Sequence, residues 1–254
     1  MSTFERIAIY EAGSEPQNVF DKFKADWGNS NFRVSRLTFV SLFFLVIAYP
    51  GLSVGFTDDP TEMLKSLNEG TRLFLLISTI IFQWFIFLLL YGTSYREGTM
   101  LAGLGFKRIR GIDFAWAFSF LLIANLLLTG LAWVLAQIGL PMPGEISFLI
   151  PTDALGRGVW VVVAITAGVC EETAFRGYLM TRLRLMGKLQ NWVIPTIVSA
   201  VVFGACHAYQ GIPGFIVITT YGLMFSLLYI RTGTIWPGII AHFFQDFGAL
   251  FFPQ

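Results

Sequence analysis

The chain has 254 residues, of which 55% are hydrophobic, 16% aromatic and only 13% charged, and its formal net charge is +1. Average chains carry about 25% charged residues, so this composition excludes an ordinary soluble domain and indicates an integral membrane protein. The near-neutral charge and the lack of a basic run in the sequence give no indication of nucleic-acid binding.

Seven apolar blocks are long enough to cross or nearly cross a bilayer, which takes about 20 residues. The sequence therefore predicts an all-α membrane protein, a polytopic bundle of about seven transmembrane helices, or eight if an early segment is a re-entrant pair. The predicted segments are 37–56, 73–93, 112–138, 158–179, 192–208, 214–230 and 234–252. The first 36 residues are polar and show no signal-peptide pattern, so we expect the first helix to stay as an anchor.

The basic residues indicate the orientation, because Lys and Arg in short loops stay in the cytoplasm. With loops assigned alternately to the two sides, fourteen of the 17 Lys and Arg residues lie on the side of the N-terminus. We therefore expect a cytoplasmic N-terminal segment, 1–36, followed by N-terminal transmembrane helices over 37–138. A compact chain without targeting or retention signals favours a bacterial plasma membrane.

Ionisable side chains inside three of the last four predicted helices are the strongest functional signal. Each such group costs about 2.5–3.5 kcal/mol at the centre of a bilayer, so these groups normally face the bundle interior and serve a function. Both histidines of the chain are among them. The residues are Glu171, Glu172, Arg176, His207, His242 and Asp246.

Helical spacing separates the roles of the adjacent glutamates. Glu172 and Arg176 are four residues apart with the acid first, which favours an ion pair within one helix. Glu171 points about 100° away from Glu172 and has no cation near it in sequence. Glu171 therefore suits a general base or acid.

The histidines also have neighbours at helical spacing. His242 and Asp246 share one helix face, where a carboxylate can orient an imidazole. Phe203 shares a face with His207, and ordinary packing explains it as well as a special role does. Helix rise counted from residue 192 places His207 about 22 Å from the inner side, further out than the other site residues. A later helix start or a tilt reduces this mismatch without removing it.

Other polar residues in the apolar blocks have structural explanations. Gln83 and Asn125 are amides in the middle of predicted helices and are interpreted as interhelical hydrogen-bond partners. Asp113 lies at a helix start and is typical of a cap. Cys170 and Cys206 each precede a site residue and are interpreted as small apolar packing residues, since neighbouring carboxylates disfavour a thiolate nucleophile.

Three short motifs in this order resemble those of a known family. "EETAFR" resembles the EExxxR motif of the CPBP family of CAAX proteases and bacteriocin-processing (Abi) proteins, "FGACH" its FxxxH motif, and "HFFQD" its HxxxN/D motif. The resemblance covers residues 158–252 as a catalytic transmembrane core. One departure is Asp246, because the type II CAAX prenyl protease branch typically has asparagine there, which bears on the prenyl-protein substrate more than on the peptidase chemistry.

The resemblance implies an intramembrane endopeptidase that acts on membrane-associated or lipid-modified peptides or proteins. By matching position, Glu171 would activate a water molecule and His207 would help to position it. His242 and Asp246 would stabilise the oxyanion or donate protons, while Glu172, with Arg176 and Phe203 in support, completes the site. Asp246 either carries a proton or orients His242.

Metal dependence is an open alternative at this point. The family has been described both as metalloproteases and as glutamate-dependent enzymes, and Glu171, His207 and His242 would be the ligands of a zinc ion. Neither histidine lies in an HExxH motif, and Glu171 serves poorly as ligand and base at once. We favour a mechanism without a cofactor.

Two other functions remain open beside the peptidase. A non-proteolytic immunity or scaffold protein of the same family would use the bundle only for binding. A proton-coupled transporter would use the same Glu, His and Asp residues as a relay, although the sequence shows no inverted repeat.

Overall fold

The computed structural model describes residues 33–54, 68–142, 150–189 and 191–251, so most of the predicted N-terminal segment 1–36 lies outside the described residues. The described residues form helices and no strand, which confirms the predicted all-α bundle. In chain order the elements are α2 (Arg36–Phe43), η2 (Phe44–Ala48), α3 (Tyr49–Val54), α5 (Glu69–Arg96), η3 (Ala102–Leu104), α6 (Gly111–Gln137), α7 (Ala154–Glu172), η5 (Thr173–Met180), α8 (Thr181–Met186), α9 (Val193–Ala205), η6 (Ala208–Gln210), α10 (Gly211–Thr232) and α11 (Trp236–Gly248).

Each predicted apolar block contains a helix, but the helices differ in length. Five helical stretches of the described chain are long and apolar enough to cross a membrane: Arg36–Ser53, Glu69–Arg96, Gly111–Gln137, Ala154–Met186 and Ala208–Thr232. Helices α9 and α11 have only 13 residues each. Their length of about 20 Å is shorter than the hydrocarbon core of a bilayer, which is about 30 Å thick.

The prediction for the fourth segment, 158–179, was too short. Residues Ala154–Met186 form one helical rod in which the π-helix η5 joins α7 to α8. Glu171 therefore lies 15 residues from the Met186 end, a distance of about 22 Å. His207 lies 14 residues from Val193, where α9 begins across the next loop, or about 21 Å. The two depths agree, so the mismatch expected for His207 arose from ending the fourth helix too early.

Side-chain caps fix where the long helices begin. Asn68 accepts a hydrogen bond from the backbone N–H of Thr71 at the start of α5 (2.9 Å). Asp153 accepts one from Gly156 at the start of α7 (2.9 Å). Such caps satisfy backbone donors that have no partner inside the helix. The predicted cap Asp113 accepts from the backbone N–H of Arg110 (2.7 Å) and so closes the first turn of α6.

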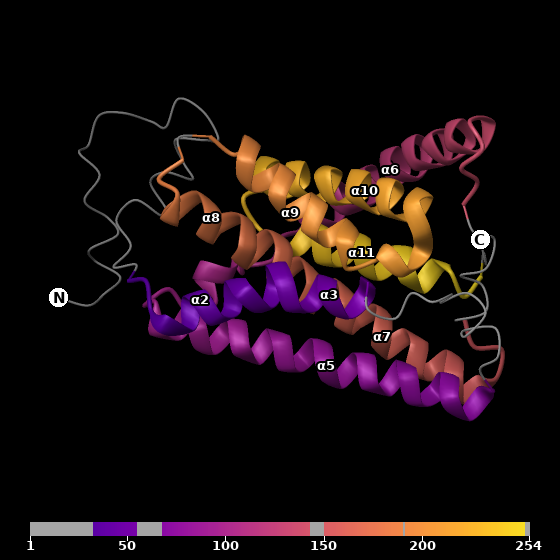
Figure 1. Cartoon of the computed structure of the whole chain (residues 1–254), viewed down its shortest axis with the longest axis horizontal. Coiled ribbons are helices and arrows are strands. Elements are labelled where there is room, and N and C mark those ends of the chain that lie inside the picture. Colours follow the sequence, from indigo (N-terminus) through magenta and orange to yellow (C-terminus); the bar gives the residue numbers. More distant parts are fainter. Residues whose placement is uncertain (1–32, 55–67, 143–149, 190, 252–254) are drawn as a thin grey trace.

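The helices pack around the rod formed by α7, η5 and α8. Helix α7 contacts α5 on one side and α11 on the other, while α9 and α10 form a hairpin through η6 and α6 packs against α10 and α11 (Figure 1). A methyl group at Gly168 would come within 2.9 Å of the Ile239 carbonyl oxygen, so glycine lets α11 approach α7 closely. Helix α6 has the outermost apolar face, with Leu122 75% and Leu126 74% exposed. An apolar face of this kind suits contact with lipid.

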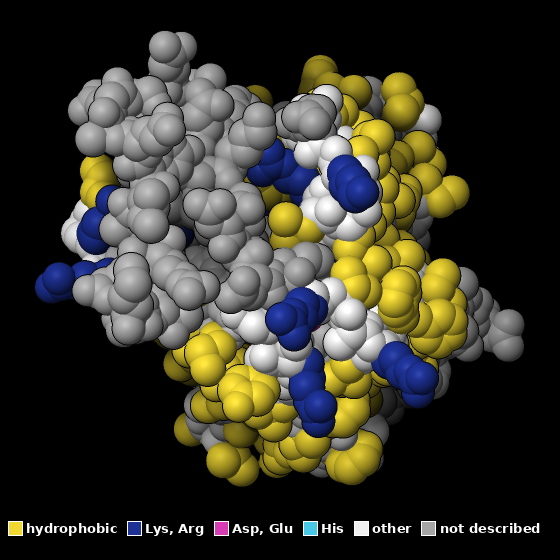
Figure 2. All heavy atoms as spheres, turned by 90° about the vertical axis from the view of Figure 1, so that its left-hand side faces the viewer, with side chains coloured by type: hydrophobic (Ala, Val, Ile, Leu, Met, Phe, Trp, Pro, Cys, Tyr) yellow, Lys and Arg dark blue, Asp and Glu magenta, His cyan; other side chains and the backbone are white. Residues whose placement is uncertain are grey.

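One end of the bundle is rich in basic side chains. Figure 2 shows Lys and Arg side chains on the face formed by the end at which α2 begins and α8 ends. The exposed basic residues among those described in the loops and helix ends there are Arg33, Arg36, Arg96, Lys107, Arg108, Arg110, Lys188 and Arg231. This clustering agrees with the loop charges from which the orientation was predicted.

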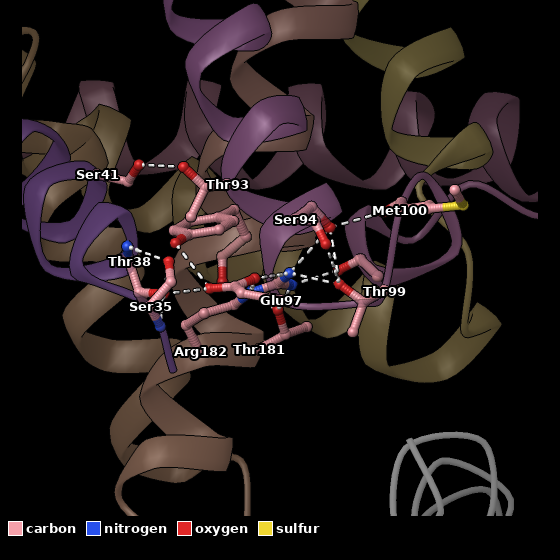
Figure 3. Close-up of polar contacts among 12 residues, drawn as sticks. Ser35, Thr38, Ser41, Thr93, Ser94, Glu97, Thr99, Met100, Thr181 and Arg182 are labelled. Carbon is pink, nitrogen blue, oxygen red and sulfur yellow. Dashed lines mark hydrogen bonds and ion pairs between the residues drawn. The ribbon is translucent and has the colours of Figure 1, made fainter. Parts of the chain in front are cut away.

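A buried ion pair lies near the same end of the bundle (Figure 3). Arg182 of α8 donates from Nη2 and Nε to Oε2 of Glu97, the residue that ends α5, at 2.6 and 3.0 Å. Neither side chain is exposed to solvent. Both residues lie outside the predicted segments 73–93 and 158–179, so no pattern in the sequence indicated this pair.

Hydroxyl and carbonyl groups from five helical elements and one loop complete the cluster around this ion pair. Thr38 of α2 and Tyr178 of η5 donate to Glu97 Oε1 at 2.8 and 3.2 Å. Arg182 also donates to Ser94, Thr99, Thr181 and the Gly103 carbonyl oxygen. A charged pair in the interior is tolerated when its remaining donors and acceptors are bonded in this way. The cluster therefore ties α2 and the end of α5 to the rod.

Candidate active site

The two adjacent glutamates close α7 immediately before the π-helix. Every residue of η5, Thr173–Met180, is buried, as are Glu171 and Glu172. The wider turn of a π-helix is uncommon and is found mostly at functional positions. The first motif of the sequence analysis, 171–176, therefore begins on an α-helix and ends on a π-helix.

The predicted pair of Glu172 and Arg176 is confirmed. Arg176 Nη1 donates to Glu172 Oε1 at 2.9 Å, and the two side chains are 0% and 1% exposed, respectively. Arg176 Nη2 donates to the Gly222 carbonyl oxygen of α10 at 3.2 Å. The guanidinium group also lies over the rings of Phe203 and Phe225, 4.4 and 4.9 Å from their centroids. The ion pair and the ring contacts together offset the free-energy cost of burying the charge of Arg176.

Glu171 is bonded through only one of its oxygens. Its Oε1 accepts a hydrogen bond of 2.7 Å from Gln83 Nε2 of α5. Its Oε2 is buried and has no hydrogen-bond partner among the described residues, and it lies 3.8 Å from His242 Nε2. Gln83 is an interhelical partner, as predicted, but its partner is a candidate site residue. An amide in the middle of a long apolar block was the signal that could have placed it in the site.

His242 lies among three carboxylates. Its Nδ1 donates to Glu172 Oε1 at 3.2 Å, while its Nε2 lies 3.7 Å from Asp246 Oδ2 and 3.8 Å from Glu171 Oε2. The ring stacks on Phe225 with centroids 5.4 Å apart. His242 and Asp246 share a face, as predicted. However, the carboxylate that bonds the imidazole is Glu172, from another helix, because Asp246 lies beyond hydrogen-bonding distance.

His207 is held at the end of α9. Its Nδ1 donates to the backbone carbonyl oxygen of Phe203 at 2.9 Å, which leaves Nε2 as the acceptor of the neutral ring. The Phe203 ring lies 5.0 Å from the His207 ring and 6.3 Å from the His242 ring, centroid to centroid. Phe203 therefore contacts both histidines as well as Arg176, which goes beyond ordinary packing of one helix.

Glycine at position 238 leaves room for Glu172. A methyl group on Gly238 of α11 would come within 2.7 Å of Glu172 Oε2. We expect Gly238→Ala to push this carboxylate away from Arg176 and His242, and overpacking of this kind costs about 1–3 kcal/mol. Activity assays and thermal unfolding in detergent would measure the effect.

Gly248→Ala is the matched control for this prediction. Gly248 ends the same helix, and a methyl group there would contact nothing within 4 Å. We expect this variant to behave as the wild type does. Equal activity of the Gly238→Ala and Gly248→Ala variants would contradict the close approach of Glu172.

The structure places both cysteines in the interior of the protein. Cys170 and Cys206 are free and buried, in keeping with their interpretation as packing residues. No group of three or more His, Cys, Asp and Glu side chains among the described residues is placed to hold a metal ion. Of the three candidate ligands, Glu171 Oε2 and His242 Nε2 lie 3.8 Å apart.

Comparison with known proteins agrees with this geometry. Residues 153–248 match the family model described as type II CAAX prenyl endopeptidase Rce1-like. No curated protein and no solved structure matches the chain. The matched region contains all three motifs and the seven predicted site residues, whereas Gln83 lies outside it. Residues 153–248 of this helical membrane protein therefore resemble an Rce1-like domain, consistent with the CPBP/CAAX protease family.

Proposed function

We propose that the protein is an intramembrane endopeptidase in which Glu171 activates the attacking water. One observation carries this proposal: Glu171 Oε2 is buried, makes no hydrogen bond among the described residues and faces His242 Nε2 at 3.8 Å. That separation is too long for a direct hydrogen bond, so Oε2 keeps its capacity to accept a hydrogen bond from water. A carboxylate in this position can accept a proton from a bound water molecule.

The residues around Glu171 supply the other groups that peptide hydrolysis needs. Glu171 takes a proton from water, and the water oxygen adds to the peptide carbonyl carbon. His242 Nε2 lies beside two carboxylates, which favour a proton there, so it can donate to the oxyanion. Glu171 then passes its proton to the amine that leaves. In this scheme Glu172 and Arg176 hold the His242 ring, and His207 Nε2 accepts a hydrogen bond from the water.

In this scheme Asp246 is not the residue that orients His242. Because Glu172 already bonds His242 Nδ1, we expect Asp246→Asn to keep or raise kcat, since an amide can donate to the oxyanion and carries no repelling charge. Asp246→Leu should lower kcat because it supplies no donor. Steady-state kinetics of the two purified variants would measure this. A loss in Asp246→Asn as large as that in Asp246→Leu would indicate the orienting role instead.

The proposed mechanism uses no metal ion. Full activity after incubation with a chelator supports it, and activity that is lost on chelation and restored specifically by zinc would overturn it. The clustered basic residues (Figure 2) further support the proposed orientation, in which the N-terminus is cytoplasmic. The membrane we propose is a bacterial plasma membrane.

The substrate class follows from the family and from the setting of the site. The matched family is named for prenyl endopeptidases, and the site lies among membrane helices. We therefore propose that the enzyme cleaves membrane-embedded or lipid-modified peptides or proteins.

The test is cleavage of membrane peptides by the purified protein in vesicles. A library should include prenylated C-terminal peptides and unmodified peptides that insert into membranes, and fragments would be identified by mass spectrometry. Cleavage by the wild type that is lost in Glu171→Ala supports the endopeptidase. No cleavage, combined with a cellular phenotype that survives Glu171→Ala, would indicate an immunity or scaffold protein. Proton-coupled solute uptake without cleavage would indicate a transporter.

A further inference from the structure

The family match does not cover the residue that contacts Glu171 most closely. Gln83 lies near the middle of α5, 88 positions before Glu171, and donates to Glu171 Oε1 at 2.7 Å. Its side chain is 4% exposed. The N-terminal helices therefore contribute a polar group to the site as well as apolar packing.

The backbone of α5 is fixed beside α7 at this level. The next residue, Trp84, donates from Nε1 to Thr166 Oγ1 of α7 at 3.1 Å, about one turn before Glu171. Phe82, on the other side of Gln83, packs against Tyr49 with ring centroids 5.5 Å apart. These contacts fix the position of α5. The Gln83 amide therefore reaches the Glu171 carboxylate without any movement of α5.

We propose that Gln83 is a positioning residue that selects which oxygen of Glu171 acts as the base. By bonding Oε1, the amide turns Oε2 toward His242 Nε2 and leaves Oε2 to receive the proton from water. This inference rests on the proposed function, because it assigns Gln83 a part in the reaction of Glu171.

The first test compares Gln83→Met with Leu90→Met. Methionine has the length of glutamine but no donor, so Gln83→Met removes the hydrogen bond while keeping the volume. We expect kcat to fall about 10- to 100-fold, the range for a hydrogen bond to a charged group, with KM changed little. Leu90, two turns along α5, is fully buried, and its exchange for methionine conserves volume, so we expect nearly wild-type kinetics.

A second variant separates positioning from packing. Glutamate at position 83 can donate only when it carries a proton, so we expect Gln83→Glu to regain activity as the pH is lowered. Gln83→Met should stay impaired at every pH. Unfolding in detergent over the same pH range is the control, since in a purely structural role the activity of Gln83→Glu would only follow its stability.

A chemical readout is independent of turnover. A hydrophobic carbodiimide modifies carboxyl groups that hold a proton, and labelling of Glu171 in vesicles can be followed by mass spectrometry. We expect faster labelling in Gln83→Met than in the wild type and in Leu90→Met, since Oε1 of Glu171 is no longer occupied by the hydrogen bond from Gln83.

The outcomes distinguish this inference from the proposed function. Unchanged kcat and unchanged labelling in Gln83→Met would overturn the role of Gln83, even if the wild type cleaves peptides. Faster labelling together with a wild type that cleaves nothing would support the contact with Glu171 and contradict the endopeptidase. If Gln83→Met fails to fold, the pH profile of Gln83→Glu decides: recovery at low pH supports the proposal, and its lack overturns it.

Discussion

Glu171→Gln is expected to lower kcat by about 10²- to 10⁴-fold, the range attributed to general acid–base catalysis. The substitution keeps the shape of the side chain and an oxygen that can accept from Gln83, but it removes the group that takes a proton from water. Because the hydrogen bond from Gln83 to Glu171 Oε1 can be kept and Oε2 has no hydrogen-bond partner among the described residues, we expect the free energy of unfolding to change little. Single-turnover cleavage and detergent unfolding of the same preparation would measure both effects.

Glu172→Gln is the control variant for this prediction. Glu172 neutralises the fully buried Arg176 and bonds His242. Removing one partner of a buried pair costs about 3–5 kcal/mol, because the remaining charge loses its compensation. We therefore expect Glu172→Gln to lower both stability and activity, whereas Glu171→Gln lowers activity alone. The opposite pattern would mean that the two adjacent acids have been assigned the wrong roles.

Glu97→Ala should destabilise the bundle by about 3–5 kcal/mol, since it removes the carboxylate that neutralises Arg182 in a buried cluster. The pair is inaccessible to solvent and joins α2, the end of α5 and α8 (Figure 3). Loss of Glu97 therefore weakens the attachment of the N-terminal helices to the rod that carries Glu171. Unfolding by a denaturing detergent in mixed micelles would measure the change in free energy.

The same helix supplies a matched control. Glu69, at the start of α5, forms an ion pair with Arg72 at 2.8 Å, but its side chain is 60% exposed. Exposed pairs of this kind contribute about 0–1 kcal/mol, so Glu69→Ala should have little effect. In contrast, the double variant Glu97→Met with Arg182→Met replaces both partners of the buried pair by apolar residues. It should lower the free energy of unfolding less than Glu97→Ala alone does. If Glu97→Ala and Glu69→Ala are equally stable, the cluster does not hold the N-terminal helices in place.

Local patterns in the sequence determined the class of the protein and most of its candidate site. Apolar blocks of about 20 residues predict membrane helices. A helix of that length crosses the bilayer with apolar side chains facing lipid and with its backbone groups hydrogen-bonded to one another. Helical periodicity predicted the Glu172–Arg176 pair, because residues four apart meet on any helix. Charge inside apolar helices marked the histidines and acids, since such groups are too costly to keep without a function.

Only the tertiary structure decided which of these groups meet across helices. Glu172 rather than Asp246 bonds His242, Gln83 bonds Glu171, and Glu97 pairs with Arg182, although the partners are 70, 88 and 85 positions apart. No local pattern encodes such contacts, because they depend on how far each helix extends, how it is rotated and where a glycine lets two helices approach. The continuation of the fourth helix to Met186 is one example, since it places Glu171 at the depth of His207. The sequence by itself therefore determined the membrane bundle and its candidate site residues, and the packing of the helices decided which of those residues contact one another.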